Sequence, residues 1–142
     1  MAGTVITDVV QSSISGTPPQ FNDSNGTQTG TLCRAWVNFN GTGTIAIRAS
    51  FNVSSITDNG TGNYTVNFTN ALTDANYSTV FTGTGKFGTV GGNAMGVPIV
   101  GASISSTTET INNTTALVQI QFVQANAGGS LDPVQANVAV FR

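Results

Sequence analysis

Apolar and polar residues alternate along most of this chain with a period of two. Val37 and Phe39, for example, alternate with Trp36 and Asn38. Such alternation places successive side chains on opposite faces of a β-strand, and no segment sustains the helical period of about 3.6 residues beyond a turn or so. The pattern therefore predicts an all-β protein whose strands are half-buried.

The alternation predicts roughly seven or eight strands, enough for an antiparallel β-sandwich or jelly-roll-like domain. One predicted strand contains Val37 and Phe39. The others are a strand with Ile45, Ile47, Ala49, Phe51 and Val53 on one face, a strand with Tyr64, Val66 and Phe68 on one face, and strands at about 76 to 83, 97 to 105, 115 to 124 and 135 to 141.

Asn-Gly pairs at Asn40-Gly41 and Asn59-Gly60 predict tight hairpin turns, because both residue types tolerate the positive φ that such turns require. The segment 83 to 96, "GTGKFGTVGGNAMG", is rich in glycine and interrupts the strand pattern. We expect it to form a long exposed loop.

The N-terminal part of the chain has a different composition. Residues 11 to 31, "QSSISGTPPQFNDSNGTQTGT", are typical of an extended linker, and the few apolar residues ahead of them offer little to bury. The sequence therefore predicts an extended N-terminal segment over residues 1–30 and a β-sandwich domain over residues 31–142. We expect the N-terminal segment to be ordered chiefly by contacts with other subunits or with a larger assembly.

Charged residues make up only 7% of the chain, and the formal net charge is −2. The polar surface must consist mainly of hydroxyls and amides, which suits a subunit that assembles with copies of itself. The four cationic residues are widely scattered, so nucleic-acid binding is not expected. No apolar stretch approaches the ~20 residues of a membrane span, and membrane insertion is not expected either.

The chain contains no histidine and one cysteine, Cys33, which we interpret as a small buried residue. Triads of the usual kind and imidazole metal sites are thereby excluded. Glycoside cleavage needs only two carboxylates, so the acidic residues of the chain have to be considered for it. A calcium site at residues 57 to 63 is not expected, because no second acidic residue follows Asp58 there. We therefore predict a protein that is not an enzyme and has no catalytic residues, cofactor or metal. The available acidic residues, three of them in positions typical of turns and loops, are Asp58, Asp74, Glu109 and Asp132.

Trp36 is the one residue with an obvious capacity to stack on a sugar ring. In "CRAWVNF" it occupies a strand position, where packing in the core or at a subunit interface is the more usual role. Both interpretations remain open from the sequence.

The stretch "CRAWVNFNGTGTIAIRASFNVSSITDNGTGNYTVNFTNALTDANYS", residues 33 to 78, resembles small tail-fibre-like virion structural proteins of tailed bacteriophages, especially phages of marine and other aquatic bacteria. The N-terminal "TDVVQSSISGTPPQFNDSNGTQTGT" and the terminal "VAVFR" are similar to the ends of that family, whereas residues 83 to 116 are not matched. The resemblance implies a β-rich, trimeric, non-enzymatic protein of the virion, in which the motif residues act as scaffold.

Three functions follow as expectations. The first is a fibre or adhesin that contributes to host attachment and contacts other virion proteins and a host glycan or protein. The second is a capsid or tail decoration (cement) protein with no receptor, and the third, which the acidic residues disfavour, is a surface-glycan depolymerase. Loops on a rigid sheet are the usual place for receptor contacts, so we expect them in the loop 83 to 96, at Lys86, Phe87 and Asn93, and in the polar segment 106 to 115.

Overall fold

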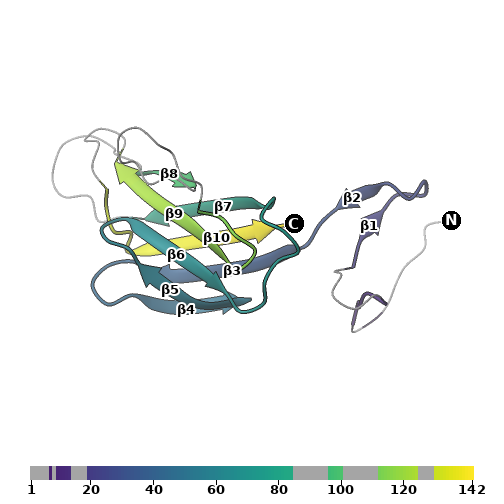
Figure 1. Cartoon of the computed structure of the whole chain (residues 1–142), viewed down its shortest axis with the longest axis horizontal. Helices are drawn as coiled ribbons and strands as arrows, with labels where there is room; N and C mark the ends of the chain where they lie inside the picture. Colours follow the sequence, from purple (N-terminus) through teal and green to yellow (C-terminus); the bar gives the residue numbers. More distant parts are fainter. Residues whose placement is uncertain (1–6, 8, 14–18, 85–95, 101–111, 125–129) are drawn as a thin grey trace. The chain divides into compact units, whose positions relative to one another are not determined.

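The computed structural model describes residues 7, 9–13, 19–84, 96–100, 112–124 and 130–142 (Figure 1). Every regular element among them is a β-strand. The chain divides into two compact units, Met1–Leu32 and Cys33–Arg142. No helix in the described part is long and apolar enough to cross a membrane.

The larger unit is a sandwich of two four-stranded antiparallel sheets (Figure 1). We call the sheet of order β4-β3-β10-β7 sheet I, and the sheet of order β5-β6-β9-β8 sheet II. The predicted β-sandwich is confirmed, whereas the jelly-roll variant is not shown. The strands are β3 (Cys33–Asn40), β4 (Ala46–Phe51), β5 (Val53–Asp58), β6 (Asn63–Phe68), β7 (Ser78–Thr84), β8 (Gly96–Val100), β9 (Leu117–Gln124) and β10 (Gln135–Phe141).

Residues 45 to 53, predicted as one strand, form parts of two strands in different sheets. Phe51 ends β4 in sheet I, Val53 begins β5 in sheet II, and Asn52 between them has a φ of 54°. Asparagine is one of the few residues that adopt this left-handed conformation readily. The Asn52 side chain fixes the corner, because its amide nitrogen donates to the carbonyls of Arg34 (3.0 Å) and Asn70 (3.1 Å).

The two Asn-Gly pairs lie at hairpins, β3 with β4 and β5 with β6, as predicted, but only Gly60 of their four residues has a positive φ. The positive φ angles fall on Gly43 in the first loop and on Gly60 and Gly62 in the second, and not on Asn40, Gly41 or Asn59. Gly41 is required for a different reason. A Cβ atom there would lie 2.8 Å from both the Pro133 carbonyl oxygen and the Tyr64 hydroxyl oxygen, so only glycine fits this close approach.

The core lies between the two sheets and is built from the predicted alternate residues of β3, β6, β7, β9 and β10. The predicted half-buried face of residues 47 to 51 is wrong, because every residue of β4 is exposed. Four aromatic rings contact one another edge to face through it: Phe39 and Tyr64 at 5.2 Å between centroids, Tyr64 and Phe122 at 6.2 Å, and Phe81 and Phe122 at 5.5 Å. These contacts join the sheets, since Phe39 and Phe81 belong to sheet I and the other two to sheet II. The smaller buried residues around them include Ala35, Val37, Val66, Val118, Ile120, Ala136, Val138 and Val140.

The N-terminal unit, predicted as an extended linker, contains a small hairpin of β1 (Phe21–Asn22) and β2 (Gln28–Gly30). Asp23 organises its turn, because one carboxylate oxygen accepts hydrogen bonds from the backbone N–H groups of Asn25 and Thr27, each at 2.9 Å. Gly26 supplies the positive φ of 81°. The sequence signal was a third Asn-Gly pair, Asn25-Gly26, within the polar run.

Candidate functional site

The predicted receptor residues Lys86, Phe87 and Asn93 lie outside the described residues, as do residues 106 to 111. The described end of the polar segment, residues 112 to 115, is engaged in the turn before β9. Asn112 donates to the side-chain oxygen of Gln119 at 2.6 Å, and the Thr114 hydroxyl accepts from the N–H of Ala116 at 3.1 Å. These contacts give residues 112 and 114 a structural role.

Three of the acidic residues considered in the sequence analysis lie in the described part of the chain, and each forms a hydrogen bond or an ion pair within the fold. Asp58 accepts a hydrogen bond from the Gly60 N–H at 2.9 Å. Asp74 forms an ion pair with Arg142 at 2.6 Å, and the hydrogen bond from this guanidinium holds the Asp74 pKa below its usual range. Glu109 lies outside the described residues, which contain no group of three side chains suited to a metal ion.

Asp132 has the most buried partners of these carboxylates. One of its oxygens lies 2.7 Å from the Tyr64 hydroxyl oxygen and accepts a hydrogen bond from the Gly62 N–H, also at 2.7 Å. The Tyr64 hydroxyl lies equally close, at 2.8 Å, to the carbonyl oxygen of Gly41. Burial, followed by the contact with Asp132, raises the pKa of Tyr64 well above its usual range. The cluster joins three loops at one end of the sandwich.

An apolar row crosses the outer face of sheet I. The strand register places Phe51 opposite Trp36, Trp36 opposite Ala139, and Ala139 opposite Val80. Directly opposed residues of antiparallel strands present their side chains on the same face. In the row, 40% of Trp36, 54% of Phe51 and 56% of Val80 are exposed. Packing in the core, one of the roles considered for Trp36, is therefore wrong. Packing at a subunit interface and stacking on a sugar ring both stay predictions.

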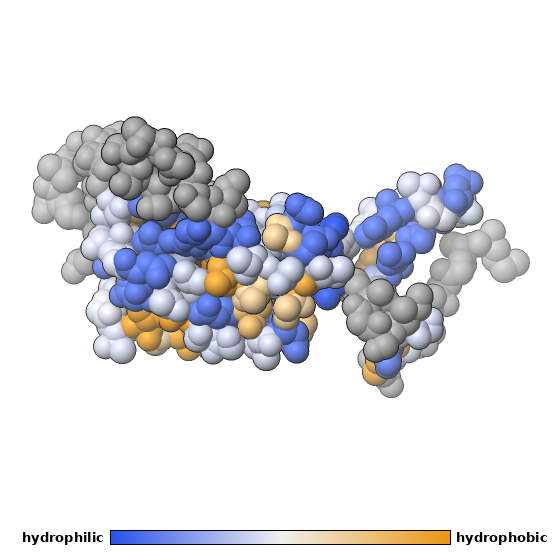
Figure 2. Space-filling view, viewed as in Figure 1, coloured by the Kyte–Doolittle hydropathy of each residue, from blue (hydrophilic) through white to orange (hydrophobic). Residues whose placement is uncertain are grey.

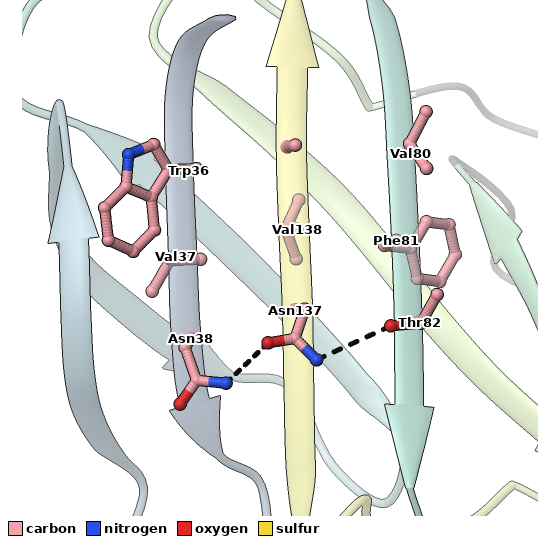
Figure 3. Close-up of a pocket in the computed structure, with 9 residues that line it drawn as sticks. Trp36, Val37, Asn38, Val80, Phe81, Thr82, Asn137 and Val138 are labelled. Atoms are coloured by element: carbon pink, nitrogen blue, oxygen red, sulfur yellow. Dashed lines mark hydrogen bonds between the residues drawn. The ribbon is translucent and has the colours of Figure 1, made fainter.

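A polar row runs parallel to the apolar one. Asn38, Asn137 and Thr82 occupy opposed positions on β3, β10 and β7. The Asn38 amide nitrogen donates to the Asn137 side-chain oxygen at 2.5 Å, and the Asn137 amide nitrogen donates to the Thr82 hydroxyl at 3.5 Å (Figure 3). Within the described residues, the side-chain oxygen of Asn38 accepts no hydrogen bond. In Figure 3 it points away from Asn137.

Residues of both rows line an open hollow of about 300 Å³. Figure 3 shows Trp36 on one side, on β3, Val80 on the other, on β7, and Asn137 on the central strand β10. None of its lining side chains is charged. The hollow is therefore a mainly apolar surface with a few convergent polar groups, which is the usual composition of a small-molecule site. Its lining residues are Trp36, Val37, Asn38, Val80, Phe81, Thr82, Asn137, Val138 and Ala139.

A second hollow of about 290 Å³ lies beside the sheet-switching corner and is lined by Arg34, Phe51, Asn52, Thr69 and Asn70. The Asn52 side chain makes all its hydrogen bonds with backbone atoms here, including acceptance from the Asn70 N–H at 2.8 Å. This hollow is a by-product of the corner, and it leaves the Trp36 hollow as the better candidate site.

The outer face of sheet II is very different. Amides and hydroxyls bond to one another along its strands: Asn67 donates to Ser55 and Thr57, each at 3.0 Å, and Gln119 donates to Asn63 at 2.8 Å. None of the described side chains of β5, β6 and β9 is a large exposed hydrophobic residue. On the side of the molecule that Figure 2 shows, hydrophilic residues gather over β6 and β9. The apolar row of sheet I is thus a property of one face.

Cys33 begins β3 and is partly buried, and its thiol lies 3.2 Å from the carbonyl oxygen of Ala35. It takes no part in the Trp36 hollow.

Comparison with known proteins finds no matching family model, no matching curated protein and no matching solved structure.

Proposed function

We propose that this chain is a structural protein of a bacteriophage virion, a homotrimeric tail-fibre-like appendage that contributes to host attachment. The observation that carries the proposal is the resemblance of residues 33 to 78 to such proteins. Residues of this stretch build β3 to β6, including the sheet-switching corner and the core residues Phe39 and Tyr64. Their place in the core and turns supports the scaffold role that the resemblance implies.

The N-terminal unit supports assembly with other chains. Four large apolar residues in its described part are exposed in the single chain: 69% of Val9, 66% of Val10, 48% of Phe21 and 41% of Leu32. A unit of this size cannot enclose them itself, so partner subunits or other virion proteins would have to cover them. The almost uncharged surface of the chain adds little repulsion against such association.

Immunogold electron microscopy of phage particles that carry the gene, with antibodies against the full chain, tests the proposal. We expect label on the tail or its fibres, and light scattering of the purified chain should give three times the chain mass of 14.5 kDa. Particles without label would contradict the virion role, and a monomer at micromolar concentration would contradict the trimer. Label confined to the capsid would favour the decoration protein, and release of fragments from host polysaccharide would favour the depolymerase.

A further inference from the structure

We infer that the hollow around Trp36, on the outer face of sheet I, binds a neutral saccharide. This inference deepens the proposed role in host attachment and rests on it only for the source of the saccharide, a glycan of the host surface. It places a binding site on residues of the sheet face and not on Lys86, Phe87 or Asn93, the residues that the sequence indicates.

The first argument is the chemistry of the surface. A saccharide ring has an apolar face of C–H groups and an edge of hydroxyls that both donate and accept hydrogen bonds. The exposed indole of Trp36 offers a flat, electron-rich partner for the apolar face. Val80 continues the apolar floor on the far side of the hollow (Figure 3).

The second argument is that the polar row, which lines the hollow, has unused hydrogen-bonding capacity. In the described part of the chain, the Asn38 side-chain oxygen has no donor, and the Thr82 hydroxyl hydrogen has no acceptor. The Asn137 amide nitrogen uses one of its two N–H groups for Thr82. The internal bonds orient these groups, and the row keeps both an acceptor and donors, either of which a sugar hydroxyl can pair with.

The third argument is charge. None of the residues that line the hollow is ionisable at neutral pH. An acidic sugar, a phosphate or a charged peptide would lose its hydration there without finding a counter-charge, which is costly. The ligand class that fits is therefore uncharged.

The size of the apolar row disfavours a second copy of the chain as the occupant. Fully enclosed aromatic side chains bury about 150–250 Å² each, and Val80 is smaller, so Trp36, Phe51 and Val80 at their observed exposures offer at most on the order of 300 Å² of apolar area. A standard interface of about 800 Å² per partner, a little over half of it apolar, needs roughly 450 Å². A hollow of about 300 Å³ is, by contrast, within the usual size range of small-ligand sites.

Trp36 is the only tryptophan of the chain, so its fluorescence reports on this site alone. The full-length protein is titrated with the methyl glycosides of glucose, galactose, mannose and N-acetylglucosamine, up to tens of millimolar. We expect at least one of them to shift the Trp36 emission to shorter wavelength and to reduce its quenching by acrylamide. Glucuronate, the charged comparison, should have no effect.

Two variants sharpen the test while they keep the fluorescent residue. Asn137→Ala should weaken binding about tenfold, because it removes the central group of the polar row. Asn67→Ala is the matched control, an amide that bonds to two hydroxyls on the outer face of sheet II, and it should leave the affinity unchanged. Trp36→Ala should abolish binding measured by ligand-observed NMR.

Two outcomes would overturn the inference. One is that none of the four neutral glycosides changes the Trp36 emission. The other is that Trp36 is already shielded from acrylamide in the sugar-free protein and that Asn137→Ala lowers the mass measured by light scattering, which would make this face an interface between copies. Neither outcome affects the immunogold result, so failure of the saccharide site and failure of the virion role are distinguishable.

Discussion

The hydroxyl oxygen of Tyr64 lies 2.7 Å from a carboxylate oxygen of Asp132, and this contact joins β6 to the segment that leads into β10. The same carboxylate oxygen accepts a hydrogen bond from the Gly62 N–H, so one acceptor holds both the loop before β6 and the first part of β6 itself. Asp132→Ala would leave both donors without this partner in a part-buried place. We expect it to destabilise the fold by about 1–3 kcal/mol, measured by urea unfolding.

Asp132→Asn retains an acceptor oxygen and should recover part of this loss. The matched control is Asp58→Ala, which removes an acceptor from an exposed turn and should cost less than Asp132→Ala. Equal losses for the two alanine variants would contradict the special role of Asp132.

Two glycines in the same loop should differ sharply. Gly41→Ala would place a Cβ atom 2.8 Å from Pro133 and from the Tyr64 hydroxyl, so backbone or core atoms must shift. Gly43→Ala meets nothing within 4 Å and is disfavoured only by its φ of 63°. We expect roughly 1 kcal/mol for Gly43→Ala and a clearly larger loss for Gly41→Ala. Thermal unfolding of the two variants and the parent measures both losses of stability. A greater loss for Gly43→Ala than for Gly41→Ala would contradict the prediction.

The tyrosines predict a loss of stability at alkaline pH. Burial raises the pKa of Tyr77 from 10.0 to about 12, and the pKa of Tyr64 is raised as well. The folded state therefore holds these protons more tightly than the unfolded chain does. The resulting stability is fully present below pH 10 and is lost as the pH rises from about 10 through 12.

Tyr77→Phe tests this pH dependence. At neutral pH the variant loses the hydrogen bond from the Tyr77 hydroxyl to the Leu117 carbonyl, at 2.6 Å, and should be about 1 kcal/mol less stable than the parent. Above pH 10 the difference should shrink, because the variant has one tyrosine fewer to ionise on unfolding. Urea unfolding at several pH values measures it, and a constant difference up to pH 12 would refute the assignment.

Removing the N-terminal unit should separate folding from assembly. Deletion of residues 1–32 leaves β3 to β10 complete, so the sandwich should retain its circular dichroism spectrum and cooperative unfolding. We expect the shortened protein to be absent from purified particles, because the exposed apolar residues that would meet other chains are gone. Normal incorporation would show that this unit has no docking role.

The loop residues Lys86, Phe87 and Asn93 provide a separate test of receptor contact. Replacing all three with alanine should leave the mass in light scattering and the melting temperature nearly unchanged while reducing adsorption of particles to host cells. Asn67→Ala, on the outer face of sheet II and outside both segments expected to contact the receptor, is the control and should not affect adsorption. Unchanged adsorption of the triple variant would leave the Trp36 hollow as the receptor site or favour the decoration protein.

Local alternation was sufficient to predict the buried faces of β3, β6, β9 and β10, because burial on one side imposes a period of two whatever the strand pairs with. It was wrong for β4, which is exposed along its whole length. The surface around Trp36 could not be predicted in this way. The alternation places Trp36 on the face opposite Val37 and Phe39, but Asn137 and Thr82 of the polar row come from strands far away in the sequence. Asn38 and Asn137 are 99 positions apart, and only the register of β3 with β10 brings them together.

The errors at loops have a similar cause. The alternation continues through Phe51, Asn52 and Val53 as if the strand were unbroken, and only the left-handed backbone at Asn52 redirects it. Gly41 was interpreted by its conformational freedom, whereas the limiting factor is the space left by Pro133. In both places, contacts between distant segments decide the structure.

The position of β10 also determines when the sandwich can form during synthesis. β10 lies between β3 and β7 in sheet I, pairs with both, and contributes Ala136, Val138 and Val140 to the core. Until residues 135 to 141 have been translated, β3 and β7 have no common neighbour, and the apolar side of sheet I has a gap at its centre. The nascent chain can pair β3 with β4 and β5 with β6 before that point. Sheet I and its side of the core can be completed only after β10 has been made, and such dependence on non-local strand pairs is typical of slowly folding β proteins.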